Sequence, residues 1–410
     1  MPHRHAAVPI PERVARTLDE AFDASAGLPL YLVGGAVRDL LRGEAGITDI
    51  DLAVDGDAAA VARRVASRLG EAARVTVHAA FGTSTVRWED MRVDIARTRS
   101  ESYARPGSLP AVEPAGIEAD LLRRDFTVNA MALRLGNGDS LLDPAGGRGD
   151  LERRAIRVLH RESFRDDPTR IFRAVRYAAR LGFELDPETD ELARAAVNEG
   201  LVGHLSGSRL RADVAAALCE PAAPDAVGRM GALGVCRAVW PGLDCGLDSQ
   251  ALLGRVEPLR QRYTPRTPAW RTALVVLARR LPDADVPGLA HRLALRRRDA
   301  ATLRASVSTP FPDEDASPAV VAETFASRPV EAALLAAALG SAAAAVYLDH
   351  LRGVRLSIDG SVLREELGLE ESPRVGEVLR ELLRRKRNGE LESRAAELAA
   401  ARDLVARAGP

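Results

Sequence analysis

Asp49 and Asp51 are separated by one residue in the largely apolar segment ITDIDLAV. Because side chains alternate along a β-strand, both carboxylates would point to one face, while Ile50 and Leu52 pack behind it. Paired carboxylate oxygens suit magnesium, which completes its shell with water and substrate phosphates. The two aspartates are therefore candidate catalytic, metal-binding residues of a phosphoryl-transfer centre. Taken alone, an Asp-x-Asp pair is more often a turn or a solvent-facing strand end.

The residues upstream of this pair favour phosphate chemistry. Gly34 and Gly35 allow close approach of the backbone to a ligand. The short helix expected after them would offer free N–H groups and the positive end of its dipole to a triphosphate. Arg38 adds a charged donor on the first turn. We therefore expect Gly35 and Arg38 to bind nucleotide phosphates.

A third carboxylate, Asp94, lies in the last of three expected strands, at residues 74–79, 83–88 and 92–96. Asp94 could join the metal site or simply cap a strand edge, and the residues do not decide between these roles. The next stretch, residues 98–118, has three prolines, two glycines and no periodicity. It is expected to be a long loop, and such loops inside compact domains are often functional.

Arg123, Arg124, Asp125 and Asn129 lie together in the dense motif RRDFTVNA. Two guanidinium groups beside a carboxylate and an amide can contact phosphate and ribose at the same time. The alternative is a surface ion cluster at the start of a helix.

A second informative segment is RDDPTRIFRAVRYAARL, in which Asp167 precedes a proline and so indicates a helix start. Arg170, Arg173 and Arg176 then follow on nearby turns. A carboxylate beside a guanidinium complements the amino donor and ring-nitrogen acceptor of cytosine and adenine, but not uracil or guanine. Asp167 and Arg170 could therefore recognise a base. The alternative is a capped helix whose arginines face water.

Composition limits the remaining possibilities. The chain has 410 residues, of which 46% are hydrophobic and 4% aromatic, so we expect two to four domains rich in helices. A net charge of −1 leaves nucleic-acid binding to local basic patches. The three cysteines lack paired metal-ligand spacing, and the most apolar run is broken by Gly340 and Ser341. We expect a cytoplasmic chain without a membrane span.

The β-strand pattern nearly vanishes beyond residue 150, and helical patterns follow to the end of the chain. One late helix carries four arginines that could follow an RNA backbone: Arg374, Arg380, Arg384 and Arg387. A solvated face in which neighbouring glutamates are the partners is nearly as plausible.

Several motifs together resemble the class II tRNA nucleotidyltransferases, the CCA-adding enzymes that share a superfamily with bacterial poly(A) polymerase. They occur in family order over the first half of the chain: LVGGAVRD with DID, FGTSTV, RRDFTVNAMA, DPAGGRGDL and DDPTRIFRAVRYAARLGF. Residues 363–383 are a weaker match to the family's tail. The family often has Glu-Asp at the position of Asp166 and Asp167, a small departure that keeps the second aspartate.

The resemblance implies an α+β fold. Its parts would be a polymerase-β-like nucleotidyltransferase α/β head at residues 1–150, an all-α neck with the base-recognition helix at 151–205, a helical body at 206–308 and a tRNA-binding helical tail at 309–410.

The resemblance also implies roles for single residues. Asp49 and Asp51 would hold two Mg²⁺ ions, while Gly35 and Arg38 would contact the triphosphate. The remaining nucleotide contacts would come from Arg124, Asp125, Asn129, Asp167, Arg170, Arg173 and Arg176, with Asp167 and Arg170 as the protein template for C or A.

The implied reaction transfers a nucleoside monophosphate from CTP or ATP to the 3′ hydroxyl of a tRNA lacking its CCA end. The tRNA acceptor end, CTP and ATP are the expected partners, and no protein partner is implied. Addition of CC only, addition of A only and poly(A) synthesis remain alternatives, although the long loop at 98–118 mildly favours full CCA addition. A non-catalytic RNA-binding relative and an enzyme acting on small molecules are less favoured. No His-Asp pair of a phosphohydrolase domain is found.

Overall fold

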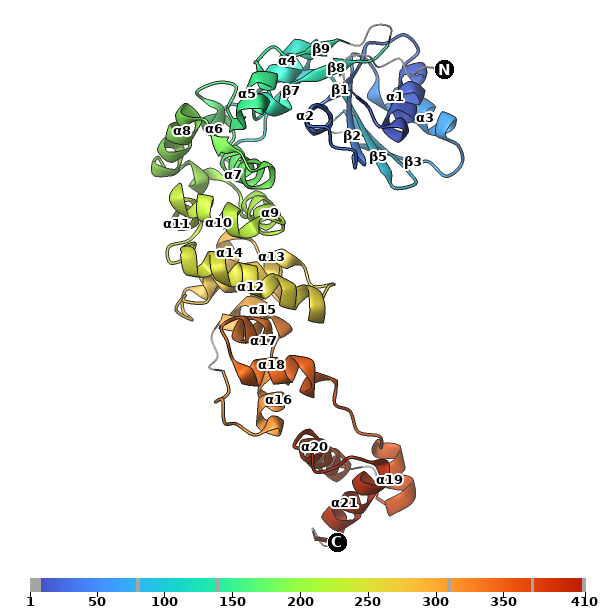
Figure 1. The fold of residues 1–410 in the computed structure, drawn as a ribbon, viewed down its shortest axis with the longest axis vertical. Helices are drawn as coiled ribbons and strands as arrows, with labels where there is room; N and C mark the ends of the chain where they lie inside the picture. Colours follow the sequence, from blue (N-terminus) through green and yellow to red (C-terminus); the bar gives the residue numbers. More distant parts are fainter. Residues whose placement is uncertain (1–8, 79–81, 137–139, 308–310, 370–371, 408–410) are drawn as a thin grey trace. The chain divides into compact units, whose positions relative to one another are not determined.

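The computed structural model describes residues 9–78, 82–136, 140–307, 311–369 and 372–407 (Figure 1). It divides into two compact units, the first formed by residues 1–209 with 232–238 and the second by residues 210–231 with 239–410. The first contains every β-strand of the described residues, and the second is helical. The expected α+β class is therefore confirmed. Phe81, the first residue of the FGTSTV motif, lies outside the described residues.

A seven-stranded mixed sheet forms the framework of the first unit, with strand order β3-β4-β5-β2-β1-β8-β9. Only β2 and β5 run parallel, and every other neighbouring pair in this sheet is antiparallel. The strands are β1 (Leu30–Val33), β2 (Asp49–Val54), β3 (Arg74–His78), β4 (Thr83–Trp88), β5 (Met91–Arg97), β8 (Ala132–Arg134) and β9 (Leu141–Leu142).

Helices α1 (Glu12–Ala24) and α3 (Ala58–Leu69) supply apolar side chains to the main core of the first unit. Leu30 and Leu32 of β1 join that core, whereas the alternate residues Tyr31 and Val33 belong to a smaller cluster with Leu121. This alternation defines two faces of the sheet. One face is the main core, and the other is free to hold polar chemistry near the end of β1.

Residues 98–118 are not the structureless loop that the sequence suggested. They form an antiparallel ribbon of β6 (Arg99–Ser102) and β7 (Ala111–Pro114), followed by the start of α4 (Ile117–Leu122). Every residue of β7 is exposed, so the strand has no apolar side to reveal its period. The ribbon forms through backbone pairing between residues up to 15 positions apart, from Ser102 with Ala111 to Arg99 with Pro114.

Past the sheet, the first unit continues mostly as helices. Asp143 caps α5 by accepting hydrogen bonds from the Gly147 and Arg148 N–H groups. The elements are η2 (Thr127–Asn129), α5 (Gly147–Arg153), α6 (Ser163–Asp166), α7 (Thr169–Leu181), α8 (Pro187–Asn198) and η3 (Leu201–His204), with the two-residue strands β10 (Ala155–Ile156) and β11 (Glu184–Leu185). Helix α2 (Gly35–Leu41) lies earlier, between β1 and β2.

Later helices account for the described remainder. They are α9 (Gly207–Leu218), which starts in the first unit, α10 (Ala223–Ala232), α11 (Val235–Val239), α12 (Leu247–Tyr263), α13 (Ala269–Ala278), α14 (Val286–Arg292), α15 (Arg297–Val307), α16 (Pro318–Ala326), α17 (Val330–Ala338), α18 (Ala342–Asp349), η4 (Leu351–Gly353), α19 (Gly360–Leu367), α20 (Pro373–Arg387) and α21 (Arg394–Arg407). In the described parts of the chain, no helix is long and apolar enough to span a membrane.

The last three helices share a small core of their own. Leu363, Leu382 and Ala401, from α19, α20 and α21, are fully buried in it. The finer division into head, neck, body and tail at residues 150, 205 and 308 stays a prediction, because the structure separates two units only.

Candidate active site

The carboxylates of β2 lie on the face of the sheet opposite its main core. Asp49 and Asp51 are exposed, whereas Ile50, between them, and Leu52, after them, are buried in the core. Strand β5 runs parallel alongside, with Asp94 in register with Asp51. The alternation expected from the sequence therefore holds, and three aspartates from two neighbouring strands gather on one face.

Although the side chain of Asp51 is exposed, protein groups surround its carboxyl group and displace part of its water, and this desolvation raises the pKa above its usual value. The nearby positive charge of Arg124 opposes the shift, whereas the negative charges of Asp94 and Asp49 add to it. A bound cation would relieve this crowding of negative charge, because it favours the ionised forms. The donor set therefore fits a hard cation such as Mg²⁺.

Asp94 is already held by protein donors. Its Oδ1 accepts a hydrogen bond from the Thr85 hydroxyl at 2.6 Å, and its Oδ2 lies 2.7 Å from Arg92 Nη2. Within the residues that the structure describes, no three His, Cys, Asp or Glu side chains are arranged to hold a metal ion. Two carboxylates completed by water and phosphate oxygens would be enough for a magnesium ion.

Gly34, directly after β1, brings the backbone against the charged groups of the site. Its φ of +72° is unfavourable for residues with a side chain, and a Cβ there would lie 2.9 Å from Arg124 Nη1 and 3.7 Å from Asp51 Oδ2. The sequence pattern assigned phosphate binding to the neighbouring Gly35. Both glycines line the site, and Gly34 is the one whose close contacts exclude a side chain.

A pocket of about 510 Å³ opens on this face of the sheet. Its lining includes nine of the residues singled out from the sequence, namely Gly35, Asp51, Asp94, Arg124, Asp125, Asn129, Asp167, Arg170 and Arg173. Asp49, Arg38 and Arg176 are not among the residues that line it. Side chains from positions 35 to 173 thus meet around one cavity.

Arg38 is buried, with 4% of its surface exposed, and its guanidinium is occupied by protein acceptors. Nε and Nη2 donate to the two carboxylate oxygens of Asp39, and Nη1 donates to Asn129 Oδ1 at 2.8 Å. Asn129 in turn donates to Asp125 Oδ1 at 3.1 Å. In this structure Arg38 therefore supports the wall of the pocket from behind.

Asp125 joins this buried chain of contacts to helix α7. Its Oδ2 accepts from Arg173 Nε at 2.8 Å and lies 2.6 Å from Arg173 Nη2. Burial alone would raise the pKa of Asp125, but Arg173, Asn129 and the Phe126 N–H group together hold it below its usual value. Asp125 is thus a fixed anion that orients Arg173.

Tyr177, one turn after Arg173, lies among three guanidinium groups. The guanidinium carbons of Arg38, Arg173 and Arg176 are 5.5, 5.7 and 5.7 Å from its ring centre. Cations within about 6 Å of an aromatic ring are attracted to its face. Tyr177 also lines the pocket, and no pattern in the sequence had selected it.

Asp167 and Arg170 both line the pocket, and protein contacts fix their orientation. Asp167 Oδ1 accepts from the backbone N–H and hydroxyl of Thr169 and from Arg209 Nη2. Arg170 donates from Nη1 to Ser163 Oγ at 2.6 Å and from Nη2 to the Arg123 carbonyl at 2.8 Å. The two groups are therefore rigid rather than free side chains on a solvated helix.

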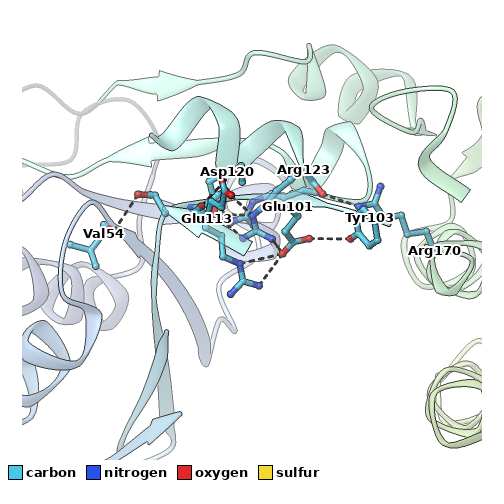
Figure 2. A network of polar contacts seen from close by, with 11 residues as sticks. Val54, Glu101, Tyr103, Glu113, Asp120, Arg123 and Arg170 are labelled. Carbon is cyan, nitrogen blue, oxygen red and sulfur yellow. Dashed lines mark hydrogen bonds and ion pairs between the residues drawn. The ribbon is translucent and has the colours of Figure 1, made fainter. Parts of the chain in front are cut away.

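The ribbon β6–β7 contributes residues that the sequence did not single out. Figure 2 shows Glu101 between the Tyr103 hydroxyl and the guanidinium of Arg123, with distances of 3.1 and 2.6 Å. Arg123 also contacts Asp120, whose other oxygen lies 2.9 Å from Arg124 Nη2. Burial and the Glu101 charge raise the pKa of Tyr103 to about 12.

This network holds Arg124 at the pocket from one side. Burial alone would raise the pKa of Asp120, but the charges of Arg124 and Arg123 keep it below its usual value. Arg124 Nε is buried and has no hydrogen-bond partner among the described residues. Glu101 was not predicted because it lies on a ribbon that was expected to be a loop. Asp120 pairs with Arg123 and Arg124 at spacings of three and four residues, a signal that the sequence does contain.

The four arginines proposed to contact RNA lie on α20 in the second unit. Arg380 and Arg384 are exposed, whereas Arg374 and Arg387 are partly buried. Arg374 donates to the Val405 carbonyl at 2.8 Å, which ties it to α21. The four do not form a single solvent-facing row.

Comparison with known proteins places the head in a defined family. Residues 30–157 match the model described as the poly(A) polymerase head domain. An A-adding tRNA nucleotidyltransferase of Geobacter sulfurreducens is 34% identical over 394 residues, covering 90% of this chain and 44% of that protein. A CC-adding tRNA nucleotidyltransferase of the same organism is 31% identical over 405 residues, covering 90% of each.

Solved structures agree over nearly the whole chain. A CCA-adding enzyme in an apo form has a TM-score of 0.82 at 27% identity, covering 97% of this chain and 96% of its own. The Thermotoga maritima CCA-adding enzyme complexed with tRNA_CCA has a TM-score of 0.77, also at 27% identity. The chain spans less than half the length of the A-adding Geobacter relative. By sequence and by fold, this chain belongs to the tRNA nucleotidyltransferase family.

Proposed function

We propose that this protein adds C and A residues from CTP and ATP to the 3′ end of tRNA, releasing pyrophosphate. The observation that carries the proposal is one cavity lined by Asp51, Arg124, Asp167 and Arg170. Such a cavity has a carboxylate for a metal, a cation for phosphate and a carboxylate–guanidinium pair for a base edge. Each group is needed for template-independent nucleotide transfer.

Asp49 and Asp51 are the proposed ligands of two Mg²⁺ ions, with Asp94 as a candidate third carboxylate. When bound, the ions would promote attack by the RNA 3′ hydroxyl and stabilise charge on the departing pyrophosphate. The raised pKa of Asp51 agrees with a site that favours a cation. The contacts of Thr85 and Arg92 with Asp94 would keep that carboxylate oriented.

The nucleotide would be held by Gly35, Arg124, Asp125 and Asn129, with Arg173 fixed by Asp125. Arg124 is the best-supported phosphate contact, because its Nη2 is anchored on Asp120 while its buried Nε is unpartnered among the described residues. Arg38 and Arg176 were expected to touch the nucleotide. Their positions beside Tyr177 fit a supporting role for both.

Base selection is assigned to Asp167 and Arg170. Their other hydrogen bonds fix both groups before the nucleotide arrives, so a base with the wrong donor and acceptor order would leave them unsatisfied. Cytosine and adenine have the matching order, and uracil and guanine do not.

The proposed RNA contact of the tail uses Arg374, Arg380, Arg384 and Arg387, and the tail itself is taken as residues 309–410. Support comes from the solved Thermotoga maritima relative, which is described as a complex with tRNA_CCA. The head, neck and body boundaries at 150, 205 and 308 belong to the same proposal, as does a cytoplasmic location.

Partial activity is the second candidate, because relatives of similar identity are named A-adding and CC-adding. One experiment separates these outcomes. The protein is incubated with Mg²⁺ and labelled CTP or ATP, and with tRNA transcripts that end before CCA, after C and after CC.

Incorporation of both nucleotides that stops at CCA supports the proposal. Incorporation of C alone, of A alone or of long A tails selects the CC-adding, A-adding or poly(A) alternative. An Arg170→Ala variant adds a test of base selection, because it should admit UTP or GTP while tRNA affinity is kept. Continued exclusion of both would contradict the template assignment.

A further inference from the structure

The second unit contains a pocket of about 430 Å³ that the proposed chemistry does not use. It lies among α9, α13 and the start of α15, and all three helices are labelled in Figure 1. The residues that matter are Arg211, Trp270, Arg271, Arg296, Arg298 and Asp299.

Most of the positive charge in this pocket is not neutralised by the protein. Arg271 is compensated, since its Nη2 lies 2.5 Å from the buried Glu331 and its Nη1 3.5 Å from Asp299. Arg211 donates to a backbone carbonyl, which carries no charge. Arg296 and Arg298 are exposed, and their guanidinium groups make no hydrogen bond or ion pair with any described residue.

Two helix starts border the same space. Helix α13 begins at Ala269 after Pro268, and α15 begins at Arg297. Their lengths are 10 and 11 residues, so each presents unpaired N–H groups and the positive end of a helix dipole. Together with the arginines, these helix ends make the pocket locally positive and favour binding of an anion, although the net charge of the whole chain is −1.

Trp270 distinguishes this pocket from a simple anion site. Its indole is partly exposed and lines the cavity beside the guanidinium groups. An aromatic face next to cations is the combination that binds a nucleic-acid strand, because a base stacks on the ring while arginines hold the backbone. A free phosphate would make no use of the ring.

We propose that this pocket binds the backbone of the RNA substrate, with a phosphate among Arg211, Arg296 and Arg298 and a neighbouring base or ribose on Trp270. The inference rests on the proposed function in one respect, that the partner is tRNA. It adds a defined contact in the helical half.

The test is the affinity of the full chain for a tRNA transcript that ends before CCA, measured at several salt concentrations. The double variant Arg296→Glu with Arg298→Glu should raise the Kd at least about tenfold and reduce the salt slope by about one to two. The matched control is Arg297→Glu, which changes the exposed neighbour between them that does not line the pocket. It should stay within about threefold of wild type.

Trp270 provides an independent readout. Trp270→Ala should weaken binding by about tenfold, and Trp270→Phe should restore most of the affinity, because stacking needs an aromatic ring and not a hydrogen bond. Melting temperatures of all variants must match wild type within a few degrees. If Trp270→Ala unfolds, the two exposed arginine substitutions still test the proposal.

Nucleotide incorporation at saturating tRNA separates this inference from the proposed function. If wild type adds nucleotides and the double variant binds tRNA as wild type does, the pocket assignment is wrong while the enzyme assignment stands. If wild type adds no nucleotides but the double variant loses tRNA affinity, the pocket assignment stands and the enzyme assignment is wrong. If the double variant keeps its tRNA affinity and loses binding of inorganic pyrophosphate, the pocket holds a free anion and the RNA assignment is overturned.

Discussion

Two arginine-rich regions of the molecule differ in what surrounds the guanidinium groups. In the first unit, Arg38 and Arg170 are buried and donate to side-chain or backbone acceptors, and Arg173 pairs with the buried Asp125. In the second unit, Arg296 and Arg298 are exposed and have no partner among the described residues. Chemically identical side chains are therefore fixed in one region and free in the other.

This difference assigns ligand selectivity to the fixed guanidinium groups and general affinity for phosphate to the exposed ones. Guanidinium groups that are held in place inside a cavity recognise one arrangement of donors and acceptors, because a mismatched ligand leaves buried polar atoms without hydrogen bonds. Exposed guanidinium groups give affinity that any phosphate backbone can satisfy and that salt screens. Changes in the first unit should therefore affect catalysis or folding, and changes in the second should affect RNA affinity alone.

The largest effect is expected at the carboxylates. Asp51→Asn keeps the shape of the side chain but removes the charge that would hold a cation, so nucleotide incorporation should fall about a thousandfold or more. The affinity for tRNA should stay within about threefold, as measured by filter binding.

Asp55→Asn is the matched control, because Asp55 is an exposed aspartate just past the end of the same strand and does not line the pocket. Turnover near wild type in Asp51→Asn would remove the basis of the metal assignment.

Substitution of Gly34 tests whether the close approach of the backbone to Arg124 is needed for activity. Gly34→Ala would place a Cβ 2.9 Å from Arg124 Nη1, so incorporation should fall about tenfold or more through a displaced Arg124. Gly43 has a similar φ of +78°, but a Cβ at that position would have no other atom within 4 Å. Gly43→Ala therefore carries the ordinary strain of a positive φ, about 1 kcal/mol, without the clash, whereas Gly34, with a ψ of −137°, also has a backbone conformation that other residues rarely adopt. Equal loss of activity in both variants would mean that strain alone, and not contact with Arg124, is responsible.

Arg173 tests whether the fixed charges stabilise the fold. Arg173→Ala leaves the buried Asp125 carboxylate without its cation, which should lower the free energy of unfolding by about 2 kcal/mol at pH 7. Because the pKa of Asp125 is lowered in the folded protein, its pairing stabilises the fold above the unfolded value of about 4, and this contribution is lost as the pH falls below that value.

Urea unfolding at pH 7, 4 and 3 checks this prediction. Fluorescence of the buried Trp88 reports on the first unit when Trp240 and Trp270, which belong to the second, are replaced by Phe in both proteins. The difference between wild type and Arg173→Ala should shrink as the pH falls below about 4, and Arg173→Lys should recover part of it at pH 7. A difference that does not change with pH would exclude the ion pair as its source.

Local patterns were sufficient to predict the framework of the first region. The apolar pattern of the sequence predicts a helix at residues 58–69 and a strand at 83–88, which are the bounds of α3 and β4. The Asp-x-Asp pair lies on one face of its strand, as expected. These features depend on period and capping within a few residues, such as the Asp57 cap of α3.

The rest of that region depends on contacts between distant parts of the chain. Arg38 meets Asn129 across 91 positions, and Arg170 reaches the Arg123 carbonyl across 47. Neither partner follows from spacing, so the sequence alone could place Arg38 near phosphate but could not show that its donors were occupied. The ribbon β6–β7 was missed for a different reason, because the residues of β7 are all exposed and so give no alternating apolar pattern.

The smallest effect is expected from substitutions on α20, where the arginines are exposed to solvent or already hydrogen-bonded to the protein. Arg380→Glu with Arg384→Glu should raise the Kd for tRNA about threefold to tenfold and lower the salt slope by about one, with kcat at saturating tRNA unchanged.

Arg402→Glu is the matched control for this pair, because Arg402 is an exposed arginine on α21, which packs in the same three-helix group as α20. A loss no greater than that of the control would mean that α20 is a solvated face. RNA affinity in the second unit would then be concentrated on the pocket beside Trp270, where unpartnered arginines and an aromatic ring lie together among the described residues.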